Sequence, residues 1–247
     1  MKRFLFAGAL AFVAVGQAAA ADLPQPMPLP PPPQAPAAYI PLATVYNWGG
    51  IYWGVNGGYA FGTSEWTDPA SSSGAGSTGD FGVTGGVFGA TIGVNMQTDA
   101  FVFGVESDFD ASWLDGKSSS TFCSSAGFTA GQCETKNTWL GTLRGRAGYA
   151  ADRVLVYGTA GGAYGNIEAG INGLVNSSEP GWTAGAGIEA AFGDNWTARI
   201  EYLFVDLANG SCTTTATCGL DKGGATPNDA VKFDASLIRL GLMYKFR

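Results

Sequence analysis

Trp139-Leu-Gly-Thr-Leu-Arg-Gly-Arg-Ala-Gly-Tyr149 is the stretch of sequence that decides the fold. Apolar and small residues occupy alternate positions in it, and Thr142, Arg144 and Arg146 stand between them. Successive side chains of a β-strand point to opposite faces, so one face of this strand is apolar and the other is polar and charged. The stretch therefore predicts a strand whose first face can meet lipid and whose second face cannot.

The same alternation recurs in three further runs, at residues 101–114, 196–206 and 233–246. The polar faces of the four runs carry charges of both signs: Glu106, Asp108, Asp110, Arg144, Arg146, Arg199, Glu201 and Arg239. Charges inside a narrow barrel must be paired and hydrogen-bonded, or each costs several kcal/mol, so these residues are expected to form a salt-bridge network in the lumen.

A register can be assumed for the charged faces. If Trp113 lies opposite Trp139, then Asp108 falls opposite Arg144 and Glu106 falls opposite Arg146. A similar register for the last two strands places Glu201 opposite Arg239.

From Trp48 onward the chain is a series of alternating runs separated by turn-rich stretches. The predicted strands lie at about 49–61, 81–95, 101–114, 138–150, 154–167, 181–192, 196–206 and 233–246. Long polar connections at about 62–80, 115–137, 168–180 and 207–232 alternate with short ones at 96–100, 151–153 and 193–195. This alternation is typical of an all-β fold, an eight-stranded antiparallel up-and-down transmembrane β-barrel with long extracellular loops.

Composition agrees with a membrane barrel. The chain has 38 Gly, 13% aromatic residues, only 13% charged residues and no His, whereas an average globular protein has about 25% charged residues. A soluble β-sandwich or lipocalin-like barrel is the alternative, because it too alternates polar and apolar positions. Tryptophan and tyrosine residues near the strand ends favour the membrane barrel, where they form interfacial girdles.

The N-terminal region predicts export. Residues 1–21 have a positive start, an apolar run of about twelve residues and an Ala-rich cleavage site, which together indicate a signal peptide rather than a membrane anchor. Residues 22–46 contain nine of the twelve prolines and are expected to form an extended periplasmic segment, followed by the barrel at 47–247. The net charge of −7 makes nucleic acid a poor partner.

The four cysteines form two pairs that are close in sequence. Cys123 and Cys133, and Cys212 and Cys218, lie in Ser/Thr/Gly-rich stretches. We expect each pair to close its own loop with a disulfide in an oxidising compartment. Zinc is the alternative, but neither pair has CxxC spacing and the chain has no His.

Several segments carry a resemblance to a known family. Residues 48–59, 85–95, 102–108 and 239–246 resemble the small outer-membrane porin-like β-barrels of alphaproteobacteria, which are similar in fold to the OmpA transmembrane domain. The resemblance covers roughly residues 47–247. It implies an eight-stranded barrel in the outer membrane, with roles in envelope integrity and surface exposure. It also implies that the barrel-assembly machinery reads the terminal aromatic residues Tyr244 and Phe246.

Function is expected to be structural, with no enzyme activity and no cofactor. A Ser nucleophile without His needs Lys or a carboxylate as its base, and no such constellation stands out. The acidic trio of strand 101–114 could instead be a catalytic or cation site. A low-conductance porin is a second alternative, and an adhesin whose loops bind a host or cell-surface ligand is a third. Outer-membrane lipid, including lipopolysaccharide, is the expected surrounding partner.

Overall fold

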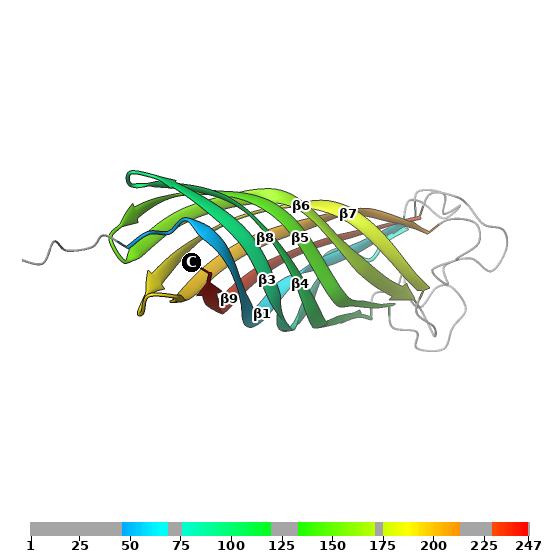
Figure 1. Ribbon diagram of the computed structural model, residues 1–247. Coiled ribbons are helices and arrows are strands. Elements are labelled where there is room, and N and C mark those ends of the chain that lie inside the picture. The colour runs from blue at the N-terminus through cyan, green and yellow to red at the C-terminus, as the bar shows by residue number, and fades with distance from the viewer. Residues whose placement is uncertain (1–45, 69–75, 120–132, 171–174, 213–228, 247) are drawn as a thin grey trace, which may run out of the picture. The chain divides into compact units, whose positions relative to one another are not determined.

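A computed structural model gives the fold of the chain and describes residues 46–68, 76–119, 133–170, 175–212 and 229–246 (Figure 1). The predicted signal peptide and nearly all of the predicted Pro-rich segment lie outside the described residues. No helix in the described part of the chain is both long enough and apolar enough to cross a membrane.

Eight long antiparallel strands and one strand of two residues make up the fold. They are β1 (Gly50–Asp68), β2 (Gly76–Ser77), β3 (Phe81–Thr98), β4 (Phe101–Ser118), β5 (Cys133–Ala151), β6 (Val154–Gly170), β7 (Val175–Ala191), β8 (Trp196–Cys212) and β9 (Asp229–Lys245). Each long strand pairs with its neighbours in sequence, and β1 also pairs with β9, so the sheet closes on itself. Figure 1 shows the tilted strands of this barrel. The predicted eight-stranded up-and-down barrel is confirmed.

One end of the barrel carries the tight turns, between β3 and β4, β5 and β6, and β7 and β8; we call it the turn end and the opposite end the loop end. The strands extend further toward the loop end than the alternation predicted. β5 begins at Cys133 instead of 138, β8 runs to Cys212 instead of 206, and β9 begins at Asp229 instead of 233. The predicted loops 115–137 and 207–232 were therefore too long at both of their ends.

The strands are longer than predicted because the polarity of their two faces inverts along their length. In the half of β9 nearest the turn end, Ile238 and Leu240 are exposed on the outer face while Arg239 is buried inside. Nearer the loop end, Phe233 is buried inside and Lys232 is exposed outside. The pairing continues unbroken across this inversion in the β1–β9 ladder. A lipid-facing pattern ends there, but the strand does not.

Aromatic side chains mark both limits of the apolar outer band. Toward the loop end, Trp139 stacks on Phe109 with ring centres 5.7 Å apart. Toward the turn end, Phe101 meets Tyr149 at 5.8 Å. Trp139 and Tyr149 are ten residues apart on β5, so a rise of about 3.3 Å per residue and a tilt of about 40° separate the two levels by about 25 Å. That height matches the apolar band of an outer-membrane barrel.

The interior is filled by side chains in three layers. The layer nearest the loop end, which we call the outer layer, lies inside the lumen and is apolar. It includes Trp66, Leu203, Leu207, Phe233 and Leu237. A charged layer lies at mid-barrel, and an inner layer near the turn end contains Tyr46, Trp48, Val102, Ala150, Leu155, Tyr157 and Ala191. Large rings cover two of the inward glycines. The ring of Tyr52 lies over Gly93, and the ring of Tyr157 lies over Gly187.

Candidate functional site

The charged layer is the most distinctive arrangement of side chains in the barrel. Every charged residue predicted for the lumen is buried there, on strands β4, β5, β8 and β9. Each reaches the interior because it occupies an inward position of its strand, where the neighbours before and after it point outward.

Arg239 lies among three carboxylates from two other strands. Its Nη1 atom is 2.9 Å from Oδ1 of Asp108 and 2.6 Å from Oδ2 of Asp110, and its Nη2 atom is 2.6 Å from Oε2 of Glu201. Glu201 stands directly opposite Arg239 in the β8–β9 ladder, which is the register expected from the sequence. One guanidinium thus joins β9 to β4 across the lumen and to its neighbour β8.

Arg144 makes a second set of contacts with the same acids. Its Nη2 atom is 2.7 Å from Glu106 and 2.6 Å from Asp108, and its Nη1 atom is 3.3 Å from Glu201. Since Arg144 and Arg239 share Asp108 and Glu201, the ion pairs form one connected network. Removing Asp108 or Glu201 would deprive both arginines, on two strands, of a buried partner.

Arg146 and Arg199 extend the network toward the turn end. Nη1 of Arg199 is 2.8 Å from Glu106, and Nη2 of Arg146 is 2.9 Å from Glu189. The guanidinium of Arg146 also lies 3.9 Å from the ring centre of Tyr157, a cation–π contact. Around these charges, buried hydroxyl groups add further hydrogen bonds. The Tyr157 hydroxyl donates to Glu201 at 2.9 Å.

The assumed register of strands β4 and β5 was wrong by two residues. Trp139 pairs with Ala111 rather than Trp113, so Glu106 lies opposite Arg144 and Asp108 lies opposite Thr142. The pairing changes by one residue between Ala111 and Leu114, which lies beyond the charged positions. Because the assumed register differs from the observed one by an even number of residues, the charged side chains keep their face and still meet inside the lumen.

Sequence reasoning missed Glu189, which is buried and accepts a hydrogen bond from Thr197 at 2.5 Å as well as pairing with Arg146. The signal was present: Glu189 is the one charged residue of the stretch 181–192 and shares the face of Thr183. With Glu189 included, five carboxylates face four guanidinium groups in the charged layer.

The carboxylates of the acidic trio are all paired with arginines. Asp108 and Asp110 of the acidic trio share Arg239, and Glu106 is held by Arg144 and Arg199. Within the residues that the structure describes, no group of three or more His, Cys, Asp or Glu side chains could hold a metal ion.

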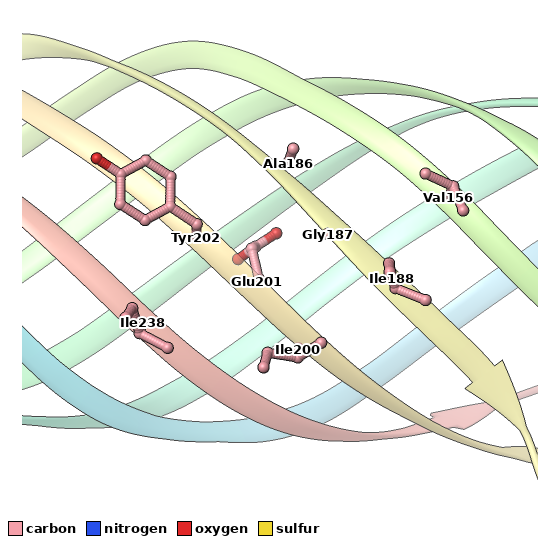
Figure 2. Close-up of a pocket in the computed structure, with 8 residues that line it drawn as sticks. All are labelled: Val156, Ala186, Gly187, Ile188, Ile200, Glu201, Tyr202 and Ile238. Carbon is pink, nitrogen blue, oxygen red and sulfur yellow. The ribbon is translucent and has the colours of Figure 1, made fainter.

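The outer face of the wall has a shallow recess of about 400 Å³ over β6 to β9. Figure 2 shows Val156, Ile188, Ile200 and Ile238 around the small residues Ala186 and Gly187, with the ring of Tyr202 beside them. Glu201 lies between two outward residues of β8, but its carboxylate contacts Arg144 and Arg239 in the lumen. The recess is therefore apolar and has no charged group to act on a ligand.

The cysteines lie partly in strands rather than wholly in loops. Cys133 is the first residue of β5 and is buried in the outer layer, and Cys212 is the last residue of β8. Cys123 and Cys218 lie outside the described residues. No cysteine in the described part of the chain is free, and the pairing stays a prediction.

The terminal aromatic residues lie at the turn end, on β9 and just after it. The ring of Tyr244 is 5.0 Å from Trp196 and 5.4 Å from Phe246, and Phe246 is half exposed on the outer face. The reading of these residues by assembly machinery stays a prediction.

A closed antiparallel barrel with an apolar outer band between aromatic girdles and a charged lumen defines the class: an outer-membrane β-barrel protein. Residues 7–246 match the family model described as the outer membrane protein beta-barrel domain. The chain belongs to this family, and it is located in the outer membrane.

Named relatives support the same assignment. The chain is 36% identical over 229 residues to the 31 kDa outer-membrane immunogenic protein of Brucella melitensis, a match that covers 86% of this chain and 88% of the relative. It is 34% identical over 211 residues to the 25 kDa outer-membrane immunogenic protein of Brucella abortus, covering 85% and 84%. It is 31% identical over 210 residues to the 22 kDa outer membrane protein of Rhizobium leguminosarum, covering 83% and 82%.

Proposed function

We propose that this protein is a structural barrel of the outer membrane, which supports envelope integrity, conducts no solutes and displays its loops at the cell surface. The observation that carries the proposal is the charged layer. Four guanidinium groups and five carboxylates from β4, β5, β7, β8 and β9 are tied together at mid-barrel, where a channel would need its open path.

The strand number supports a filled interior. Eight strands enclose a space about wide enough for their own side chains, whereas open aqueous pores are built from roughly 16 strands. Here the apolar outer layer lies above the charged layer and the aromatic inner layer lies below it. A solute would have to cross two apolar layers and one layer of ion pairs.

A non-enzymatic role is part of the proposal. A catalytic carboxylate or a hydroxyl nucleophile needs a free partner that can take or give a proton. The lumen carboxylates are instead held by arginines, which stay charged and cannot act as bases at neutral pH. The absence of His from the whole sequence removes the usual base.

The loops and their disulfides form the displayed part. We propose that Cys123 pairs with Cys133 and Cys212 with Cys218, so that each long loop is closed next to the strand that holds it. Cys133 and Cys212 stand at strand ends, where a disulfide would tie its loop to the rigid barrel. Peptide mapping without reduction should recover each local pair, and a crosslink between the two loops would overturn this pairing.

The proposed partners are lipopolysaccharide around the barrel and the assembly machinery that reads Tyr244 and Phe246. Phe246 is exposed at the turn end, where such a reader could reach it. Substitution of Phe246 by Ala should lower the amount of protein assembled in the outer membrane, whereas Phe101→Ala, in the same girdle, should not.

A deletion strain tests the structural function in cells. Loss of the protein should raise sensitivity to detergent while leaving the uptake rate of small hydrophilic solutes unchanged. Reduced uptake with normal detergent resistance would instead establish a porin. A variant with shortened loops and an intact barrel should restore detergent resistance, and loss of cell attachment in that variant alone would add an adhesin role.

A further inference from the structure

The residues immediately before β1 enter the turn end of the barrel. Tyr46 is 6% exposed and Trp48 is 1% exposed, although both precede the first strand. The sequence assigned Tyr46 to the Pro-rich segment and gave Trp48 no role beyond the start of the barrel. In the structure, Tyr46 and Trp48 are part of the inner layer, and we call residues 46–48 the clasp.

Hydrogen bonds tie the clasp to two of the tight turns. The Trp48 N–H donates to Oε1 of Gln97 at 2.6 Å, at the end of β3. The Trp48 indole Nε1–H donates to the carbonyl oxygen of Asp152 at 3.0 Å, and the Tyr46 N–H donates to the carboxylate of Asp152 at 3.2 Å. Asp152 lies in the β5–β6 turn, so the clasp bridges two hairpins.

A further contact ties the clasp to the last strand. Nζ of Lys245 donates to the carbonyl oxygen of Asn47 and lies 4.4 Å from the ring centre of Tyr46. Lys245 is the last residue of β9 and pairs with Tyr52 of β1. The β1–β9 ladder is the seam at which the barrel closes, and the clasp fastens one end of it.

The rings of the clasp also pack across the lumen. Tyr46 and Trp48 meet edge to face with ring centres 4.9 Å apart. They lie in one cluster with side chains of four strands between the two seam strands: Val102 of β4, Ala150 of β5, Leu155 and Tyr157 of β6, and Ala191 of β7. Opening the seam would pull these rings out of an apolar layer that they share with distant strands.

We propose that the Tyr46–Trp48 clasp is a lock on the closed barrel, which forms after the strands have assembled and slows the opening of the β1–β9 seam. Its contacts join residues 49, 104, 106 and 198 positions apart in sequence. The clasp site exists only once both hairpins and β9 are in place. An interaction absent from the folding transition state affects the unfolding rate and leaves the folding rate nearly unchanged.

Substitution of Trp48 by Ala tests the lock in the full chain refolded into lipid vesicles. We expect its unfolding rate in urea to rise at least tenfold and its folding rate to change by less than about threefold. The matched control is Trp53→Ala, which removes a tryptophan of β1 that lies on the outer face and is 48% exposed. We expect its unfolding rate to change by less than about threefold. Equal unfolding rates for Trp48→Ala and the unchanged protein would overturn the proposal. A folding rate of Trp48→Ala that falls by as much as its unfolding rate rises would also overturn it.

Two milder variants keep the test usable if Trp48→Ala does not refold. Trp48→Phe retains an apolar ring but loses the indole donor to Asp152, and Lys245→Met retains the length of the side chain but loses its contact with Asn47. Both should unfold faster than the unchanged protein. Hydrogen exchange of the Phe246 amide, which donates to Ile51 across the seam at 2.9 Å, should accelerate in both. Unchanged exchange and unchanged unfolding in both variants would contradict the lock.

Discussion

At the scale of single residues, Arg239 and Arg144 each form ion pairs with three buried carboxylates, and Arg239 joins the last strand to the network. Arg239 is 1% exposed and lies within 2.9 Å of oxygen atoms from Asp108, Asp110 and Glu201. Arginine suits this position because its planar group offers several donors in a fixed geometry. Its neighbours depend on it, since Asp110 has no other ion pair among the described residues.

Replacing Arg239 by Met should lower the free energy of unfolding by about 3–5 kcal/mol, because removing one partner leaves buried charges uncompensated. Urea unfolding of the refolded protein in vesicles measures the change. The matched control is Lys136→Met, which breaks a 3.0 Å pair with Glu134 at the exposed end of β5 and should leave the free energy of unfolding nearly unchanged. Similar losses for the two variants would show that the charged layer contributes no special stability.

The faces of the lumen charges could be predicted from sequence, but their partners could not. Face follows from the period of two, which local sequence displays directly. Partners depend on register, and the observed β4–β5 pairing differs by two residues from the one assumed from Trp113 and Trp139. Arg199 illustrates the same limit, because it contacts Glu106 of β4, a strand far from β8 in the ladder.

At the scale of elements, β1 shows how a narrow barrel accommodates its seam. Its inward glycines Gly54, Gly58 and Gly62 each bring the backbone of β9 close. A Cβ atom at Gly58 would lie 2.1 Å from the carbonyl oxygen of Ile238, too close for any real contact. Gly57, the next residue on the outer face, has its nearest neighbour at 3.3 Å, on the Phe88 ring.

Substitution of Gly58 by Ala should therefore disturb closure of the seam, whereas Gly57→Ala should be tolerated. A closed barrel resists SDS without heating, so the temperature at which gel mobility changes measures the effect. We expect a lower transition temperature for Gly58→Ala and little change for Gly57→Ala. Equal behaviour of the two variants would mean that the wall adjusts without cost at the seam.

The positions at which the strands begin and end could not be predicted from the sequence. The strands were predicted from an alternation with apolar residues outside and polar residues inside. This alternation holds only between the aromatic girdles. Beyond Trp139, β5 continues with Glu134 and Lys136 partly exposed and with Cys133 and Thr135 buried. A strand can therefore continue with polar residues outside and apolar residues inside. Both patterns must be considered before a stretch of sequence is assigned to a loop.

At the scale of the whole molecule, the barrel combines two kinds of β-structure. Between the girdles it has a membrane barrel's apolar exterior and charged interior. Near the loop end it has the apolar interior and polar exterior of a water-soluble barrel. This arrangement raises the ends of the strands above the apolar band and holds them on a packed core, which is a suitable base for the loops that we propose are displayed.

Planar-bilayer recording of the refolded protein tests most directly our proposal that the filled lumen does not conduct. Insertion should first be verified by resistance to SDS without heating, so that a silent membrane is known to contain closed barrels. We predict no unitary current steps over many insertions at moderate voltages. Reproducible steps that persist in independently refolded preparations would contradict the account and establish a path through the charged layer.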